Sequence, residues 1–593
     1  RGYVLTMTEL FMSPTLSINQ VLPQRRADFA TLTEALDYAA QGQTGINFYD
    51  HRCRLLTGIP WSSLRFQAQS VARSLLSLGL ARGDRVALIA DTGPDFLQSF
   101  FACQYAGLVP VPLPVPPALG NKAVYLQRLS RLLAQCDSAV LLAPDSMLEV
   151  VRPAAGGLRF FGSVATLLAL PAVSVKLVAS GADEVAYLQY TSGSTTFPRG
   201  VVVTQQAAMA NLRGIVGAAG LDLRVGDRAV SWLPFYHDMG LVGFVLGPMA
   251  AQISVDYLST QSFAMRPRQW LTLISQNHAS ISYAPPFGYE LCARRIREED
   301  VARLDLSRWR IAGTGAEPIR AEILHRFADL LAPAGFDRHA FFPSYGLAEA
   351  TLAVCFPQAG SGAQTETVDR QWLESSGEAR LCTETPERRC STLVNCGRVL
   401  PDHELVIRDA HDTPLADGLV GRITVRGPSL MSGYHADPQH TRQSLSAEGW
   451  LDTGDLGYTR DGQLFITGRS KELIIVNGRN IWPQDIEHLA ESVDGVRSGD
   501  SIAFAVETAD DQRVVLQVEC RLADAAARTA LASQLRHLLQ ADFAIACEVD
   551  LVAPQSLPRT SSGKRARGEA KHRYLNQQQA ASEQSAPVAQ HAG

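Results

Sequence analysis

One stretch, Tyr190 to Gly200, constrains the fold more than any other part of this 593-residue chain. It reads YTSGSTTFPRG and lies between two apolar runs, Val185 to Tyr190 and Val201 to Val203. The runs predict two strands joined by a loop that holds a permissive glycine and several small hydroxyl side chains. Such a loop can wrap a polyphosphate with backbone N–H groups and hydroxyls. The lysine that follows the glycine of a Walker loop is absent, so an ordinary NTPase loop is disfavoured, and a Ser/Thr-rich hairpin turn is the alternative.

Length and composition predict a globular protein of two or more domains. The net charge of −5, without a strongly basic domain, disfavours nucleic acid as a partner. The ten cysteines show no CxxC pair, which argues against structural zinc and predicts buried thiols in a reducing compartment. We find neither an apolar run of about 18 residues nor a secretion leader, so we expect no membrane span and a cytoplasmic location. Met7 is a plausible natural start.

Apolar periodicity along the chain favours an α/β fold, because helical and strand-like segments alternate. Proline-rich Gly107 to Pro117 is expected to run extended along a surface or a sheet edge. The other segments are predicted as helices over Leu32 to Ala40, Trp61 to Gly79, Leu126 to Gln135 and Gln205 to Val216, and as strands over Arg85 to Ile89, Ala139 to Leu142 and Ala229 to Leu233.

Three further strand-to-loop junctions carry small or polar residues. They are SWLPFYHDMGLVGFVLG from Ser231, IAGTGAEP from Ile311 and FFPSYGLAEAT from Phe341. Because α/β sheets bind ligands at such junctions, we expect one shared crevice. His237 lies in the first junction, where a lone histidine is more commonly structural than catalytic. Glu349 alone would be a first-turn helix acid, but beside a polyphosphate loop it becomes a candidate magnesium ligand.

Changes in composition divide the chain into domains. We predict an N-terminal extension (1–30), a large domain (31–468) with an insertion at about 354–394, a C-terminal domain (469–574) and a disordered tail (575–593). Lys564 lies in a Ser/Gly loop within a basic cluster, Leu557 to Arg573, whose usual interpretation is a solvated or nucleic-acid-facing patch.

In their order, YTSGSTTFPRG, GAEP, SYGLAEAT, WLDTGD, GRSKE and PRTSSGK resemble the acyl-adenylate-forming superfamily of acyl-CoA synthetases, peptide-synthetase adenylation domains and luciferases. The segments WLPFYHDMGLVGFVLGP, LDLSRWRIAGTGAEPIR and FFPSYGLAEATL, with the insertion, look like the fatty acyl-AMP ligases. The resemblance covers nearly the whole chain. It implies an N-terminal domain of two α/β sheet subdomains and a small β unit, followed by a mobile α+β C-terminal domain.

The implied reaction is ATP-dependent activation of a medium- or long-chain fatty acid to acyl-AMP, with release of pyrophosphate. Acyl transfer to the phosphopantetheine thiol of an acyl carrier protein would follow. Since no carrier domain follows residue 574, that protein is expected to be a separate chain.

The resemblance also implies a role for each matching residue, with ATP and Mg²⁺ as the bound groups. Lys564 would bridge the acyl carboxylate and the α-phosphate, His237 would lie near that carboxylate, and Lys471 would be the hinge of the C-terminal domain. Magnesium would be bound by Glu349 and Thr191. The nucleotide would be bound by Thr191, Ser192, Gly193, Ser194, Thr195, Gly315, Ala316, Glu317, Ser344, Tyr345, Gly346, Asp455 and Arg469.

Two loop positions depart from the superfamily pattern: Thr196 stands where glycine is common, and Arg199 stands where lysine is common. The insertion is expected to oppose the domain rotation that coenzyme A transfer needs, with Trp372 and Leu373 as its anchor; an ordinary surface loop is the alternative. The rival functions are a fatty acyl-CoA ligase, a peptide-synthetase adenylation domain and a non-catalytic nucleotide-binding scaffold.

Overall fold

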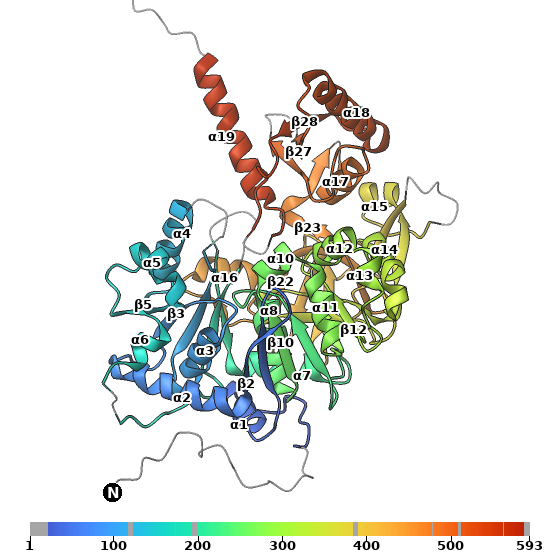
Figure 1. Ribbon diagram of the computed structural model, residues 1–593. Helices are drawn as coiled ribbons and strands as arrows, with labels where there is room; N and C mark the ends of the chain where they lie inside the picture. Colours follow the sequence, from blue (N-terminus) through green and yellow to red (C-terminus); the bar gives the residue numbers. More distant parts are fainter. Residues whose placement is uncertain are drawn as a thin grey trace, which may run out of the picture.

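The computed structural model describes residues 22–116, 122–171, 174–191, 198–382, 390–476, 478–507, 512–560 and 563–585. A large N-terminal part carries a smaller C-terminal domain on one side, and helix α19 (Arg567–Ser585) projects away from both (Figure 1). The predicted fold class, α/β with a large domain and a smaller α+β domain, is confirmed. The described helices include none that is both long enough and apolar enough to cross a membrane.

Within these residues the largest sheet has seven strands. Its neighbouring strands are parallel except at the β1–β2 edge, where they are antiparallel. Central strands such as β12 are buried along their whole length, as expected of a parallel sheet covered on both faces. In sheet order the strands are β13 (Phe341–Pro343), β12 (Ile311–Thr314), β11 (Ile281–Tyr283), β9 (Arg228–Ser231), β10 (Ser254–Leu258), β1 (Gly45–Tyr49) and β2 (Leu55–Pro60).

Aromatic side chains join the helices beside this sheet into one core. Trp270 of α11 (Arg268–Gln276), Tyr289 of α12 (Pro286–Arg295) and Phe327 of α14 (Ala321–Leu331) are all buried. Their ring centroids lie 5.4, 6.4 and 6.2 Å, respectively, from the ring centroid of Trp309. Edge-to-face rings in such a cluster add to the apolar burial that holds helices on a sheet.

A second subdomain lies around a parallel sheet in the order β4 (Val109–Leu113), β3 (Arg85–Ile89), β5 (Ser138–Leu142) and β6 (Phe160–Gly162). The proline-rich strand β4 is at the edge of this sheet, as predicted, because Pro110 and Pro112 cannot donate to a second neighbour. A third sheet, β21 (Gly433–Tyr434), β8 (Gly200–Thr204) and β7 (Val185–Tyr190), contains the two strands predicted on either side of the hydroxyl-rich loop. The helices of this subdomain include α2 (Trp61–Ser77), α3 (Pro94–Ala106) and α4 (Lys122–Gln135).

The small β unit is the antiparallel sheet β19 (Glu404–Arg408), β20 (Gly421–Arg426), β22 (Leu451–Arg460) and β23 (Gln463–Arg469). The predicted insertion forms the antiparallel pair β16 (Thr365–Asp369) and β17 (Cys390–Val394), with α15 (Arg370–Ser376) between them. Of the predicted anchor, Leu373 is buried in a cluster with Tyr458 and Trp482, whereas Trp372 is 41% exposed. The prediction of an apolar anchor is therefore right for Leu373 and wrong for Trp372.

Two cysteines of the insertion correct the prediction of free thiols. Cys382 and Cys390 form a disulfide, because β17 returns antiparallel to β16 and brings the two residues together. The other eight cysteines, all within the described ranges, are buried and free.

The C-terminal domain has its own apolar core under the sheet β26 (Ser501–Glu507), β27 (Gln512–Glu519) and β28 (Cys547–Val552). The hairpin β24 (Ile474–Val476) and β25 (Arg479–Ile481) precedes α17 (Pro483–Glu491), which begins at the predicted proline, and α18 (Ala525–Phe543) follows. The predicted end of order at residue 574 is wrong, because α19 continues through Gln- and Ala-rich sequence to Ser585.

Candidate active site

The candidate site lies where parallel strands of the large sheet end. The carboxyl ends of β9, β12 and β13 lie at the same edge and lead into the segments of His237, Gly315 and Ser344. A side chain at Gly315 would place its Cβ 2.6 Å from the backbone oxygen of Ser344, so glycine is required there. Ala316 follows with φ of 69°, a left-handed conformation that non-glycine residues rarely adopt. The GTGAEP turn is thus held in an uncommon backbone shape at the edge of the crevice.

Asp455, Arg469 and Tyr345 form a polar group on the side of the small β unit. Asp455 of β22 and Arg469 of β23 are cross-strand partners, and Arg469 Nε lies 3.1 Å from Asp455 Oδ1. The hydroxyl of Tyr345 donates to Asp455 Oδ2 at 2.7 Å. Burial raises the pKa of Asp455, and the nearby Arg469 guanidinium counteracts this. The structure therefore brings together these three predicted nucleotide-binding residues.

Lys564 reaches this crevice from the C-terminal domain. Burial lowers the pKa of its ammonium group, and the carboxylates of Glu317 and Asp238 counteract this, so those groups lie in its field. Its loop is anchored through its neighbour Arg565, which donates to Glu487 Oε2 of α17 at 2.9 Å. Arg567 likewise lies 2.6 Å from Glu472, which belongs to the short turn Ser470–Glu472 that carries the predicted hinge Lys471. The ion pair of Arg567 with Glu472 therefore connects the segment that follows Lys564 with the turn that carries Lys471.

His237 lies between the large sheet and this lysine. Its Nδ1 is 2.6 Å from Oδ1 of Asp238, the first residue of the short helix α8 (Asp238–Leu241). Burial alone would raise the pKa of Asp238. The charges of His237 and Lys564 outweigh this effect, so the pKa lies below its usual value. The pair explains why a histidine stands here, because the carboxylate fixes the orientation of the ring.

Glu349 lies at the same crevice in the short helical turn Ala348–Ala350. Burial raises the pKa of its carboxyl group, and the Tyr434 hydroxyl, which donates to Oε1 at 2.8 Å, counteracts this. No cluster of three or more His, Cys, Asp and Glu side chains that could hold a metal occurs among the described residues. A single carboxylate fits Mg²⁺ that is shared with substrate phosphates, since this ion is commonly bound through one or two carboxylates plus phosphates and water.

The hydroxyl-rich loop is described only at its ends. Thr191 donates its N–H to the carbonyl of Arg199 at 3.0 Å, which closes the base of the loop. The predicted phosphate-binding residues Ser192, Gly193, Ser194 and Thr195, with Thr196, lie outside the described residues. Arg199 Nε is 3.8 Å from Asp437, and its guanidinium lies over the ring of Tyr434.

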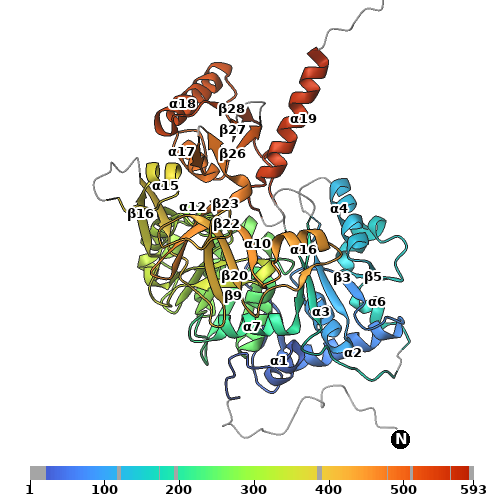
Figure 2. The same ribbon diagram turned by 180° about the vertical axis from the view of Figure 1, so that it is seen from behind.

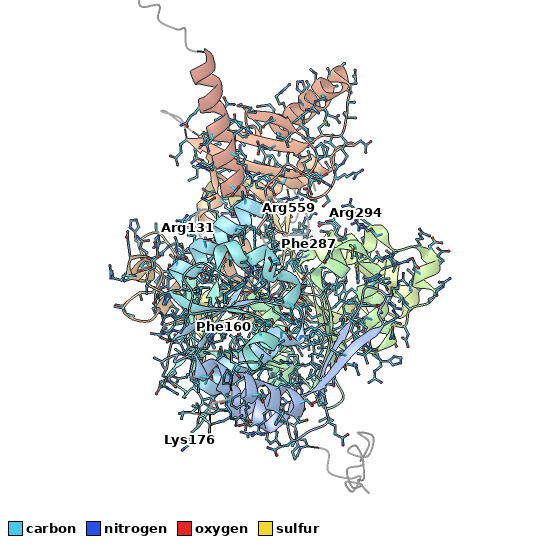
Figure 3. All side chains as sticks on the ribbon, turned by 60° about the vertical axis from the view of Figure 1, so that its left-hand side comes forward. Arg131, Phe160, Lys176, Phe287, Arg294 and Arg559 are labelled. Carbon is cyan, nitrogen blue, oxygen red and sulfur yellow. A yellow bond between two sulfur atoms is a disulfide. The ribbon has the colours of Figure 1, made fainter. Side chains whose placement is uncertain are left out.

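The predicted site residues within the described ranges all line one cavity of about 1240 Å³, which also has an apolar lining. Phe287 and Arg559 lie where the two domains meet (Figure 3). The wall also includes a π-helical segment, Val242–Leu246, of which Gly243 and Phe244 line the cavity. The apolar lining side chains include Ile215, Leu221, Leu223, Phe244, Pro248, Ile253, Ile281, Ile323 and Phe356.

Sequence reasoning did not find Tyr434, although it contacts the predicted metal ligand. Tyr434 comes from β21, which is brought to the site only by pairing with β8. Its local sequence, SGYH, carries no motif that signals a contact made across more than eighty residues.

Comparisons with known proteins agree with this geometry. The AMP-binding enzyme family matches residues 54–435, and the AMP-binding enzyme C-terminal domain matches residues 478–568. A solved structure from a study of fatty acyl-adenylate ligases from E. coli and L. pneumophila is 52% identical, with a TM-score of 0.90, and the match covers 94% of this chain and all of that one.

Two relatives have names that imply different acceptors. A Caulobacter vibrioides protein that is provisionally named an acyl-CoA synthetase is 45% identical over 577 residues, 96% of this chain and 98% of its own. The medium-chain-fatty-acid–[acyl-carrier-protein] ligase JamA of Moorena producens is 33% identical over 93% of this chain and 96% of its own. Both names nevertheless refer to acyl substrates, and the family matches span both domains. The chain therefore belongs to the AMP-binding enzymes of the acyl-adenylate-forming superfamily and is an acyl-adenylate-forming ligase.

Proposed function

We propose that the protein activates a medium- or long-chain fatty acid with ATP, releases pyrophosphate, and passes the acyl group to the phosphopantetheine thiol of a separate acyl carrier protein. The observation that carries the proposal is the continuity of one cavity. Its polar end holds Lys564, Glu317 and Asp455, and its apolar lining lies between α7 (Gln205–Val216) and the π-helical segment. A carboxylate with a long hydrocarbon tail matches both ends at once.

The residues fit the first half-reaction. An oxygen of the acyl carboxylate attacks the α-phosphorus of ATP, and the bond between the α-phosphorus and the pyrophosphate oxygen breaks. Because two anions must approach, catalysis depends on charge neutralisation and alignment. In our proposal Lys564 lies between the two anions, His237 is near the carboxylate, and Asp455 and Arg469 hold the ribose.

The remaining roles concern phosphate and adenine. Glu349 and Thr191 would hold Mg²⁺, which neutralises phosphate charge when it is bound. The loop residues Ser192 to Thr195 would contact the phosphates. Adenine would lie against Gly315, Ala316, Glu317, Ser344, Tyr345 and Gly346, and Lys471 would be the point about which the C-terminal domain turns.

Contacts of the insertion support a carrier protein as the acceptor. Helix α15 lies beneath the C-terminal domain in both views (Figures 1 and 2). Glu374 of α15 accepts from Arg479 of β25 at 2.5 Å, and Arg370 donates to the carbonyl of Asp542 at 3.0 Å. These contacts oppose the rotation that we associate with coenzyme A transfer. A cytoplasmic location fits the same proposal, since soluble carrier proteins and ATP occur there.

The second candidate is a fatty acyl-CoA ligase, which the Caulobacter vibrioides relative favours by its name. It shares the first half-reaction and differs only in the acceptor. A single incubation series separates the two: ATP, Mg²⁺ and fatty acids of graded length, with coenzyme A, with a phosphopantetheinylated carrier protein, or with neither.

We expect acyl-AMP to accumulate with coenzyme A and to be converted to thioester with the carrier. Rapid acyl-CoA formation would refute the carrier assignment. ATP–pyrophosphate exchange that does not depend on added fatty acid would refute the substrate class, and the absence of any exchange would favour a nucleotide-binding scaffold.

A further inference from the structure

Most arginine and lysine side chains that line the cavity are paired. Arg199, Arg320, Arg370, Arg422, Arg469, Arg565 and Arg567 each form an ion pair with a carboxylate, and Arg559 donates to backbone carbonyls. In the described lining, Arg128, Lys471 and Lys564 remain as cationic side chains without a hydrogen bond or an ion pair. Two of these three already have a proposed role. Arg128 has none.

Arg128 is held in the cavity wall by the helix that carries it. It belongs to α4, whose leucines at 129, 132 and 133 pack in one apolar cluster with Tyr190 of β7. One turn before it, the Tyr125 hydroxyl donates to the carbonyl of Pro114 at 2.9 Å. Residues three and four apart share a helix face, so Arg128 lies on the face between Tyr125 and Leu132, which also lines the cavity.

Tyr236 is a neighbour of Arg128, and it is hydrogen-bonded in turn to strand β7, which leads into the hydroxyl-rich loop. Arg128 and Tyr236 are close enough to interact electrostatically. The carbonyl of Tyr236 accepts from Gln189 Nε2 at 2.7 Å, and Gln189 is two residues before Thr191, where the loop begins. The guanidinium therefore lies on the side of the cavity where strand β7 leads into that loop.

Burial of a guanidinium without a partner is unfavourable. Burial lowers the pKa of Arg128, and the two groups that counteract this are Glu569 of α19 and Tyr236. Glu569 does not reach it as an ion-pair partner and is instead 2.6 Å from Arg573. A half-buried cation that lines a cavity and has no ion-paired carboxylate is suited to an anion that arrives with the substrate.

We propose that Arg128 binds the β- and γ-phosphates of ATP, and then the pyrophosphate that leaves. This inference rests on the proposed adenylation reaction and adds a binding residue to it. A polyphosphate is favoured over the acyl carboxylate because α4 packs against Tyr190 of β7, the strand that leads into the hydroxyl-rich loop, whereas Lys564 is already proposed to bind the carboxylate. Arg128 would also attract the leaving pyrophosphate away from the α-phosphorus.

The test compares ligands with and without the distal phosphates. Titration calorimetry with Mg²⁺ would measure the affinity of Arg128→Met for AMP and for α,β-methylene-ATP, which carries all three phosphates and is not cleaved. The matched control is Arg131→Met, which removes a guanidinium from the same helix at a position outside the cavity lining. Arg131 is labelled on α4 in Figure 3. Arg128→Lys serves as the conservative variant.

For Arg128→Met we expect the affinity for the ATP analogue to fall roughly ten- to a hundredfold, the range for a lost charge-assisted hydrogen bond, with AMP affinity unchanged. Arg128→Lys should restore part of the loss, and the KM for pyrophosphate in the exchange reaction should rise in parallel. Unchanged affinity for the analogue would overturn the proposal, as would equal weakening of AMP.

A third outcome would also overturn it: normal affinity for the analogue with a defect confined to carrier acylation, since Arg128 would then serve the phosphopantetheine phosphate. Failure of the proposed function is distinguishable from these results. Wild-type protein would then lack exchange that depends on fatty acid, while the comparison of AMP with the analogue would still report on Arg128.

Discussion

Replacing Arg479 by methionine tests whether the insertion restrains the C-terminal domain. Arg479 of β25 donates to Glu374 of α15 at 2.5 Å, and its second guanidinium nitrogen donates to the carbonyl of Phe543 at 2.8 Å. Glu374 has a side chain that is 4% exposed, and after the substitution its nearest cation would be Arg370, at 3.7 Å. Methionine keeps the apolar stem of the arginine and removes the charge. The change therefore weakens the contact between insertion and domain without opening a large cavity.

The size of the effect follows from the type of bond that is lost. A hydrogen bond between charged groups contributes about 1.5–3 kcal/mol. The Arg479 side chain is 31% exposed, so solvent screening reduces this to ~1–2 kcal/mol. About 1.4 kcal/mol corresponds to a factor of ten. The fraction of molecules whose C-terminal domain is rotated should therefore rise roughly 5- to 30-fold.

A single-turnover reaction of preformed acyl-AMP with coenzyme A measures that fraction. The rate of acyl-CoA formation should rise by the same factor, whereas the rate of acyl-AMP formation should change little. Arg380→Met is the matched control, because Arg380 is also in the insertion but pairs with Glu378 at 2.9 Å and lies over Trp372. The exchanged pair Glu374→Arg with Arg479→Glu should restore part of the restraint. An Arg479→Met enzyme that captures coenzyme A no faster than wild type would refute the reasoning.

The remaining predictions concern chemistry and stability. Lys564→Met should slow acyl-AMP formation roughly tenfold or more, because loss of a charge-stabilising donor costs about 3 kcal/mol, and a near-normal rate of pyrophosphate exchange would contradict its role. Glu349→Gln keeps a side-chain oxygen for the Tyr434 hydroxyl but removes the charge, so we expect slower adenylation that added magnesium partly restores; a defect independent of magnesium would argue against a metal ligand. Burial raises the pKa of Asp485 from 3.8 to about 7, so the contribution of its protonation to stability is complete below 3.8 and is lost as the pH rises through about 7. The melting temperature of wild-type protein should therefore fall more steeply than that of Asp485→Asn between about pH 5 and about pH 8, and parallel curves would show that Asp485 titrates normally.

Much of the secondary structure could be predicted because its signals are local. Helix α7 spans the predicted Gln205–Val216, where the Thr204 side chain accepts from the N–H of Ala207 and caps the first turn. Strand β3 matches its prediction because Arg85–Ile89 is a short, almost wholly buried apolar run. Helix α17 begins at Pro483, since proline is favoured at the first helical position.

Contacts between distant segments could not be predicted from such signals. The Cys382–Cys390 disulfide depends on the return of β17 against β16, and nothing in the spacing of the ten cysteines marks that pair. Arg128 resembles any arginine on an amphipathic helix until the packing of α4 against β7 directs it to the cavity. For Trp372 the sequence predicted a buried contact that the structure does not contain. Its hydrophobicity suggested an anchor, but the side chain is exposed and the Arg380 guanidinium lies over its ring.

The choice of acid and the choice of acceptor depend on different parts of this molecule. The apolar lining belongs to the N-terminal part, so substitutions there should change which acid is activated. The position of Lys564 depends on polar contacts between the two domains, including Arg320 with Glu491 at 3.0 Å and Glu374 with Arg479 at 2.5 Å. If the C-terminal domain turns as one body, these contacts must break together before a thiol can replace Lys564 at the acyl group. Acceptor selectivity would then be a property of the domain interface, and an enzyme with an altered chain-length preference should keep its original acceptor.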